Sequence, residues 1–300
     1  ESMDYEWIED EVFIEEYNCD YTSEEISKVL TTGKHNLEFN YGGNMAYAFN
    51  DASYSNCTNI TSSGKYNLSA NILEYNSTEF CFDINASDVI FDCLGYQVEG
   101  AYSSTDNLTA FRVYNSTNVT IKNCIINEFS YGIYFEEESD NGYVINNTIK
   151  TETLSESHQG ITTDNSDEIL IENNTLRQIG DGENGFAISL SDSINNVINN
   201  NAVYDGISNV IYLIGDQSIC SGNNITNNEI NESGFSSILI YDCDTIIIFN
   251  NTIRDANEHS LEIDGGSSNI IIKNNMFFNS SDESIYVLSS TNITIKDNVL

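Results

Sequence analysis

Basic residues are the side chains whose positions are most informative here, because they are scarce. The chain has 10 Lys+Arg against 47 Asp+Glu. Proton abstraction beside a carboxylate needs a base, and glycoside hydrolysis needs two carboxyl groups at a defined separation. Acidic pairs arise by chance in such a chain and identify no site. The cations after residue 60 are Lys65, Arg112, Lys122, Lys150, Arg177, Arg254, Lys273 and Lys296. We nominate no catalytic residue from this pattern.

Metal chemistry is also weakly indicated. The three histidines, His35, His158 and His259, are isolated in the sequence, and the three methionines form no cluster with them. The acidic runs Glu136–Glu138 and Asp242–Asp244 could hold Ca²⁺ only weakly, because no EF-hand loop or calcium-binding repeat surrounds them. The sequence therefore predicts no metal site and no cofactor beyond such weak Ca²⁺ binding.

The overall charge limits the partners. A formal net charge of −37 repels phosphate backbones and anionic headgroups, which argues against nucleic acid and acidic membranes as partners. No apolar run approaches the roughly 18 residues that a transmembrane helix needs. The chain begins at Glu1 without a basic leader, and we expect that a signal peptide was removed or that the sequence was trimmed. A hydrophobic fraction of 40% favours a folded protein over a disordered one.

A repeat organises the positions of these residues. The pattern apolar-x-apolar-x-Asn-Asn-x-apolar recurs, for example at residues 169–176, 246–253 and 270–277. Its second Asn column falls at 124 (a cysteine), 147, 174, 201, 228, 251, 275 and 298. A second column consists of Ile133, Ile161, Ile188, Ile211, Ile238, Leu261 and Ile285. Two columns that share one spacing make chance repetition a poor explanation.

The repeat predicts an all-β fold, a parallel β-helix (solenoid) with coils of about 23–27 residues. Short alternating Ile/Val segments between turn residues are typical of strands. The absence of proline agrees, because a proline would delete a ladder hydrogen bond between coils. We predict that residues 60–300 form the solenoid and residues 1–59 an N-terminal cap or arm. Within the latter, Thr22–Glu25 resembles a capping box that opens a helix through Leu30.

The paired asparagines receive separate roles. Strand alternation places the first Asn of each pair inward, where stacked amides would bond from coil to coil. The second would adopt the left-handed conformation of a tight corner. The predicted structural ladder is Asn123, Asn146, Asn173, Asn200, Asn227, Asn250 and Asn274.

The seven cysteines permit one prediction from register. Cys220 and Cys243 each lie eight residues before the second Asn column, so they should stack one coil apart and form a disulfide. Cys81 with Cys93 and Cys19 with Cys57 are weaker pairs without support from register. An odd number leaves one thiol free or bonded to another molecule.

Sequons for N-glycosylation begin at fifteen positions, more than chance placement predicts. Those at Asn146, Asn173 and Asn250 coincide with the predicted ladder and are assigned to structure. The glycan candidates are Asn56, Asn59, Asn67, Asn76, Asn85, Asn107, Asn115, Asn118, Asn224, Asn231, Asn279 and Asn292. Several lie in turns, where an oligosaccharide fits.

The segments Ser63–Ile72 and Cys81–Gly100, together with the repeat, resemble the right-handed parallel β-helix of the pectin-lyase-like superfamily, especially NosD-type repeats and related archaeal surface proteins. The resemblance covers about residues 60–300 and implies the right-handed fold. That superfamily includes lyases, hydrolases, epimerases, adhesins and structural proteins, so fold alone does not set activity. The Gly-His-Gly, Asp-Asp and Arg-x-Lys signatures of its polygalacturonases are absent, and the negative surface would repel a polyuronate.

Two functional hypotheses follow. The leading one is a non-enzymatic, extracellular structural protein: a glycosylated β-solenoid subunit that self-assembles into a surface layer, sheath or filament. A last repeat that ends at Leu300 without a polar cap favours it, because end-to-end stacking would cover the open edge. The alternative is a polysaccharide-binding or polysaccharide-degrading β-helix protein. Tyr and Phe clustered on one outward column beside Asp or Arg would favour the alternative.

Overall fold

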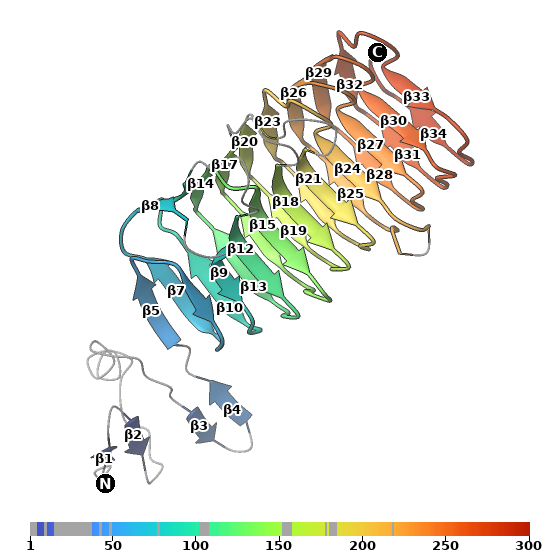
Figure 1. Ribbon diagram of the computed structural model, residues 1–300. Helices are drawn as coiled ribbons and strands as arrows, with labels where there is room; N and C mark the ends of the chain where they lie inside the picture. Colours follow the sequence, from blue (N-terminus) through green and yellow to red (C-terminus); the bar gives the residue numbers. More distant parts are fainter. Residues whose placement is uncertain are drawn as a thin grey trace.

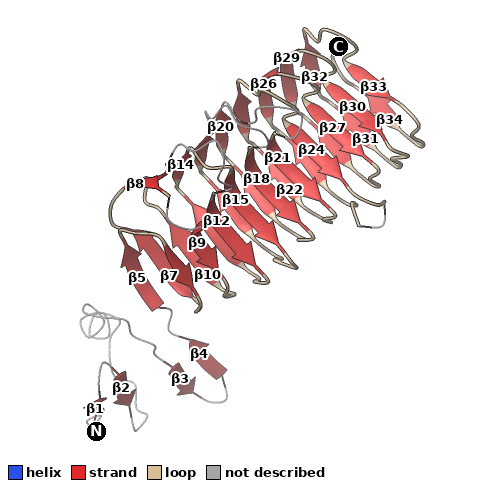
Figure 2. Cartoon of the chain, in the orientation of Figure 1, coloured by secondary structure: helices blue, strands red, loops and turns tan. Residues whose placement is uncertain are grey.

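The structure is a computed structural model whose core is a parallel β-solenoid (Figure 1). It describes the backbone of residues 5–8, 11–14, 38–41 and 44–47. From residue 50 it describes the chain to residue 300 except residues 77–78, 102–107, 152–157, 178, 180–184 and 218. The described residues form strands, turns and loops without a helix (Figure 2). Each complete coil contributes one strand to each of three sheets, which we call sheets 1, 2 and 3 in chain order.

The strand bounds show how regular the coils are among the described residues. Sheet 1 contains β5 (Asn50–Tyr54), β7 (Gly64–Leu68), β10 (Val89–Asp92), β13 (Val119–Lys122), β16 (Tyr143–Ile145), β19 (Leu170–Glu172), β22 (Val197–Asn199), β25 (Asn224–Thr226), β28 (Ile247–Phe249), β31 (Ile271–Lys273) and β34 (Thr294–Lys296). Sheet 2 contains β8 (Ile72–Tyr75), β11 (Gln97–Gly100), β14 (Ile125–Asn127), β17 (Thr148–Lys150), β20 (Thr175–Arg177), β23 (Ala202–Tyr204), β26 (Glu229–Ser233), β29 (Thr252–Ala256) and β32 (Met276–Phe278). Sheet 3 contains β6 (Thr58–Ile60), β9 (Phe80–Ile84), β12 (Thr109–Tyr114), β15 (Tyr131–Glu136), β18 (Gln159–Asp164), β21 (Phe186–Ser191), β24 (Ile211–Ile214), β27 (Ile238–Tyr241), β30 (Leu261–Asp264) and β33 (Ile285–Val287).

The apolar columns predicted from the repeat lie in register in the core. The apolar column from Ile133 to Ile285 runs in register across the strands of sheet 3. All its members except Ile285 are fully buried. Neighbouring strands of a sheet lie about 4.8 Å apart, so each isoleucine packs on its equivalent in the next coil. The predicted all-β solenoid is confirmed, and its uniform interior follows from this stacking.

The predicted orientations of the paired asparagines are wrong, because the structure exchanges them. The predicted amide bonds from coil to coil do occur between some first asparagines, where Asn200 donates to Asn173 and Asn250 Nδ2 donates to Asn227 Oδ1 at 2.8 Å. The first Asn of each pair has a left-handed backbone, with φ near 57° at Asn146 and 56° at Asn173, and its side chain faces solvent. The second Asn is buried. Strand alternation holds only for extended backbone, and one left-handed residue turns the chain so that the following side chain points inward. The first Asn positions therefore form an outer corner, from Asn123 through Asn146, Asn173, Asn200, Asn227, Asn250 and Asn274.

The buried ladder consists of the second asparagines. Asn174 donates its backbone N–H and its Nδ2 to Asn201 Oδ1, at 2.9 and 3.0 Å, and also donates Nδ2 to Val144 O at 2.8 Å. The same arrangement repeats at Asn147, Asn201, Asn228, Asn251 and Asn275. Each amide thus satisfies backbone groups of the corner that would otherwise be buried without partners.

Three disulfides connect adjacent coils. Cys220 bonds to Cys243, as their register predicts, with Cα atoms 4.8 Å apart. The weaker predictions are wrong, because Cys57 pairs with Cys81 and Cys93 pairs with Cys124. A disulfide needs Cα atoms within about 7 Å, a condition that these cysteines meet one coil apart in stacked positions. Cys19 lies outside the described residues.

The N-terminal region contains two antiparallel pairs, β1 (Tyr5–Ile8) with β2 (Glu11–Ile14) and β3 (Glu38–Tyr41) with β4 (Asn44–Tyr47). β5 already pairs in parallel with β7, so the ladder includes residues 50–54, which precede the predicted boundary at residue 60. The predicted helix from Thr22 to Leu30 lies outside the described residues.

The glycan candidates divide by exposure. Exposed positions are Asn56, Asn59, Asn76, Asn85, Asn115, Asn118, Asn279 and Asn292, whereas Asn67, Asn224 and Asn231 are half-buried and Asn107 lies outside the described residues. Asn146, Asn173 and Asn250 are also exposed, because they occupy the outer corner rather than the ladder. Burial therefore gives no reason to exclude these three sequons.

Candidate functional site

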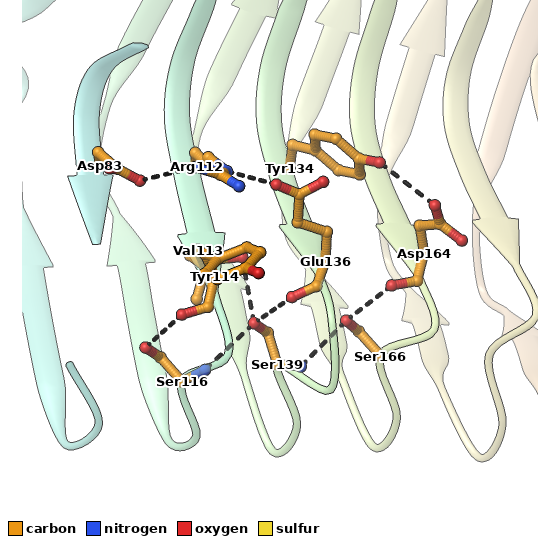
Figure 3. A network of polar contacts seen from close by, with 10 residues as sticks. All are labelled: Asp83, Arg112, Val113, Tyr114, Ser116, Tyr134, Glu136, Ser139, Asp164 and Ser166. Carbon is orange, nitrogen blue, oxygen red and sulfur yellow. Dashed lines mark hydrogen bonds and ion pairs between the residues drawn. The ribbon is translucent and has the colours of Figure 1, made fainter. Parts of the chain in front are cut away.

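The outer face of sheet 3 carries side chains of varied chemistry. Its central outward column reads Asn59, Asp83, Arg112, Tyr134, Thr162, Ser189, Tyr212, Leu239, Glu262 and Tyr286. A structural repeat needs similar residues at equivalent positions, and this column has none of that regularity. We define the sheet 3 cluster as Asp83, Arg112, Tyr134, Glu136 and Asp164, from strands β9, β12, β15 and β18 (Figure 3).

Arg112 is the centre of the sheet 3 cluster. Its guanidinium pairs with Glu136 through Nε and lies 3.6 Å from Asp83 Oδ1 through Nη1. It also lies over the rings of Phe80 and Tyr114, at 4.5 and 4.3 Å from their centroids. A guanidinium held by two carboxylates and two rings is fixed in position, because ion pairing and cation–π contact act together.

Tyr134 and Asp164 form the second half of the cluster (Figure 3). The Tyr134 hydroxyl donates to Asp164 Oδ2 at 3.3 Å. Burial raises the pKa of Asp164, and the charges of Asp192 and Glu136 raise it further against the opposing hydrogen bond from Tyr134. Burial and the charges of Asp164 and Glu136 raise the pKa of Tyr134. Asp164 is therefore a carboxyl group that is more readily protonated than an exposed aspartate.

Aromatic rings border the cluster on the same face. Tyr131 stacks on Tyr134 with ring centroids 5.4 Å apart, and Phe186 stacks on Tyr212 at 4.5 Å. Burial raises the pKa of both Tyr131 and Tyr212. Between these pairs, the Thr162 hydroxyl donates to Gln159 Oε1 at 2.6 Å. Thr162 and Phe186 are themselves buried, so the half-buried Tyr131 and Tyr212 supply the accessible rings. Rings beside hydroxyl, amide and carboxyl groups are the mixture that sugar-binding surfaces need, since a sugar ring has apolar C–H faces and polar edges.

The structure distributes the other sequence-identified cations over different faces. Lys122, Lys273 and Lys296 lie on the outer face of sheet 1, where Lys122 pairs with Asp92 at 3.2 Å. Lys150, Arg177 and Arg254 lie on the outer face of sheet 2. Arg112 is thus the cation of sheet 3 among the described residues, and its charge is already matched by carboxylates.

The histidines and acidic runs remain separate. His158 is buried, whereas His259 Nδ1 lies 3.3 Å from Glu283 Oε2 and its ring stacks on Tyr286. Within the described part of the chain, no group of three or more His, Cys, Asp or Glu side chains could hold a metal ion. A search of the described residues found no candidate for a membrane-spanning helix.

Comparison with known proteins assigns the fold family. The sequence matches the family described as the right handed beta helix region over residues 56–220 and 152–300, so the chain belongs to that family. A comparison with curated protein sequences found no significant match. The handedness that the resemblance implied is therefore shown, whereas the archaeal resemblance is not.

Several solved structures superpose on this chain at low sequence identity. The A-module of a mannuronan C-5 epimerase from Azotobacter vinelandii superposes with a TM-score of 0.63 at 10% identity, covering 79% of this chain and 65% of its own. This chain thus spans just under two thirds of that structure. A DFA-IIIase from Arthrobacter chlorophenolicus A6 in complex with GF2 has a TM-score of 0.60 at 10% identity, covering 83% and 85%. A mutant tailspike protein of the E. coli bacteriophage HK620 in complex with a pentasaccharide has a TM-score of 0.57 at 10% identity, covering 79% and 55%.

Sequence reasoning missed the sheet 3 cluster although a signal was available. The outward neighbours of Ile133 and Ile161 are aperiodic, and the residues that follow Ile133 include Tyr134 and Glu136. Counting outward from the isoleucine column would have placed these groups on one face. Which coils bring them within contact distance depends on loop lengths that the repeat alone does not fix.

Proposed function

We propose that the protein binds a neutral polysaccharide along the outer face of sheet 3. The observation that carries this proposal is the aromatic-flanked sheet 3 cluster, where Arg112 is already neutralised and carboxylates are in excess. A uronic acid polymer would lie beside the carboxyl groups of Glu136, Asp164 and Asp83, and the single cation of the cluster is already ion-paired. The carboxylates of such a polymer would therefore be repelled. A neutral glycan can stack on Tyr131 and Tyr212 and bond to the carboxylates without that cost.

The comparisons support this proposal over a self-assembling structural subunit. The similar solved structures include carbohydrate-active enzymes and a protein bound to a pentasaccharide. The outward aromatic residues beside Asp and Arg also meet the criterion that separates the two hypotheses. Self-assembly and glycosylation stay predictions, and the prediction of a non-enzymatic protein receives no support. Three disulfides agree with an extracellular location, because such bonds persist in oxidising compartments.

Glycoside hydrolysis is a second candidate function, favoured by one observation. Glu136 and Asp164 are Cα partners on adjacent strands, and adjacent strands lie about 4.8 Å apart. Retaining glycosidases use carboxyl groups about 5–5.5 Å apart, one as the proton donor and one as the nucleophile. Asp164, whose pKa is raised, would be the proton donor, and Glu136, the partner of Arg112, would be the carboxylate.

Binding is tested with an array of neutral and acidic oligosaccharides, followed by calorimetry on the best ligand. We expect a neutral ligand to bind, and its affinity to fall about tenfold or more in Tyr131→Ala. The binding free energy lost with the stacking and contacts of the Tyr131 ring should exceed about 1.4 kcal/mol. The matched control is Tyr143→Ala on sheet 1, which should leave affinity unchanged. Absence of any neutral ligand, or equal loss in both variants, would overturn the proposal.

Hydrolysis is tested by product analysis with the bound glycan. Asp164→Asn and Glu136→Gln should each abolish product while retaining binding, whereas Glu172→Gln on sheet 1 should not change the rate. If wild-type protein binds the glycan but releases no product, the protein is a binding protein and the hydrolytic role is excluded. If product forms equally in all variants, the assigned carboxyl groups are wrong.

A further inference from the structure

The outer face of sheet 2 carries a second arrangement that the sheet 3 proposal does not use. Its outward column reads Asn127, Lys150, Arg177, Tyr204, Asn231, Arg254 and Phe278 in continuous register. Three of the chain's 10 Lys+Arg therefore occupy one line on a protein with 47 Asp+Glu. From Lys150 to Phe278 the column crosses five inter-strand steps, about 24 Å at 4.8 Å each.

Arg177 and Arg254 are held by aromatic rings instead of acids. The Arg177 guanidinium lies 4.6 Å from the Tyr204 ring centroid, and that of Arg254 lies 4.4 Å from the Phe278 centroid. Both arginines are exposed, and neither has an ion pair among the described residues. Stacking fixes each guanidinium plane and leaves its edge N–H groups directed away from the ring. Such edges bind carboxylates in a bidentate manner.

The surroundings restrict what shape of anion can bind. The corner beside the column is acidic and exposed at Asp205, Glu232 and Asp255. A duplex nucleic acid, with phosphates on both sides of a wide cylinder, would meet that corner and be repelled. A single extended chain fits the face, because its carboxylates can follow one line. Arg177 and Arg254 are three steps apart, about 14 Å.

The second outward column of sheet 2 is mixed. It reads Thr148, Thr175, Ala202, Glu229, Thr252 and Met276 in register, so one exposed carboxylate on β26 interrupts the threonine hydroxyl groups. Hydroxyl groups there and the amide of Asn231 can bond to sugar hydroxyls. We propose that the outer face of sheet 2 binds an acidic polysaccharide along the solenoid axis, through Arg177 and Arg254, at a site separate from sheet 3.

Polygalacturonate oligomers serve as the probe, with neutral dextran oligomers of equal length and single-stranded DNA as comparisons. At about 0.15 M salt we expect binding of polygalacturonate only. Arg177→Gln and Arg254→Gln should each weaken it about tenfold, since a charge-assisted hydrogen bond contributes about 1.4 kcal/mol or more. Lys273→Gln, an equal charge change on sheet 1, should alter affinity less than twofold. Glu136→Gln should leave it unchanged, which separates this site from sheet 3.

Salt dependence provides a second test on the unaltered protein. At an ionic strength of about 0.01 M the Debye length is about 30 Å, so the polymer is repelled by the whole −37 charge of the protein. At about 0.15 M the Debye length is about 8 Å, and contacts at the site itself determine the affinity. We therefore expect tighter binding at 0.15 M than at 0.01 M. No binding at 0.15 M, equal losses in the arginine variants and Lys273→Gln, or equal affinity for DNA would overturn the proposal.

Discussion

The buried corner between sheets 1 and 2 and the outer face of sheet 3 follow opposite rules. At the corner the same side chain recurs coil after coil from Asn147 to Asn298, and every copy makes the same bonds to backbone groups. On sheet 3, equivalent positions hold Asp83, Arg112 and Tyr134 in succession. Repetition therefore marks side chains that hold every coil to the next in the same way, whereas the varied sheet 3 positions bring groups of different chemistry together at one place.

Removing one amide from the ladder should have the largest effect on stability. Asn201→Ala deletes the acceptor of Asn174 N–H and the donor to Ile171 O, at 2.9 Å each. Leaving both groups buried and unpaired should lower the free energy of unfolding by about 3 kcal/mol in urea titration. The control is Asn200→Gly at the exposed corner, where φ is 53° and glycine fits, so the loss should stay below about 0.5 kcal/mol. Equal losses would show that the ladder is not the stabilising element.

Replacing Cys220 and Cys243 by serine should have a somewhat smaller effect. Removing a disulfide of this loop length costs about 3 kcal/mol. The stacked turn positions before and after them hold Ser166, Ser193 and Ser267, which accept backbone N–H bonds from the preceding coil. Serine at both positions would continue that hydroxyl column, so we expect a net loss of about 2 kcal/mol. Replacing both by valine, which lacks a hydroxyl, should cost about 1 kcal/mol more in the same titration. If the valine variant is as stable as the serine variant, the serine hydroxyl groups do not compensate for part of the lost disulfide.

Cations on the two faces should differ in their effect on stability. Arg112→Met leaves Asp83 and Glu136 without their cation, at side chains only 16% and 19% exposed. We expect a loss of about 1.5 kcal/mol, between the values for exposed and buried ion pairs. Lys122→Met on sheet 1 removes a more exposed pair and should cost less than about 0.5 kcal/mol. Thermal unfolding of both variants in parallel compares the two losses of stability. A larger loss in Lys122→Met than in Arg112→Met would contradict the stabilising role assigned to the Arg112 ion pairs.

The smallest expected effect is a pH dependence of opposite sign at two aspartates. Folding raises the pKa of Asp164, so its contribution to stability is present below its ordinary pKa of 3.8 and is lost as pH rises through the raised value. Asp164→Asn should therefore gain about 1–3 °C in Tm relative to the unaltered protein on going from pH 4 to pH 7.

Asp244 provides the contrasting case. Hydrogen bonds from Ser268 and Thr245 lower its pKa, so its contribution is present above 3.8 and is lost as pH falls. Asp244→Asn should therefore lose Tm relative to the unaltered protein on going from about pH 2 to about pH 4, the interval in which the ionised Asp244 gains its contribution. Calorimetric scans over each aspartate's own pH interval check the two signs, and matching signs would contradict the assigned environments.

The sequence by itself determined the features that repeat. The isoleucine column, the coil length, the absence of proline and the Cys220–Cys243 pairing all follow from register, because stacking equivalent residues is what a solenoid requires. The same register did not reach the Cys93–Cys124 pair, because the two cysteines are separated by 31 residues in the sequence, more than the 23–27 residues of the predicted coils.

Tertiary structure decided what does not repeat. Simple alternation predicted Asn146 inward, and one left-handed residue reversed it. Register could align Arg112 with Asp83 on adjacent strands, but only the folded coils show which side chains reach each other and which cations remain without acids. Those contacts depend on side-chain direction across strands far apart in the sequence, so the chemistry of sheets 2 and 3 becomes visible only when the coils are stacked.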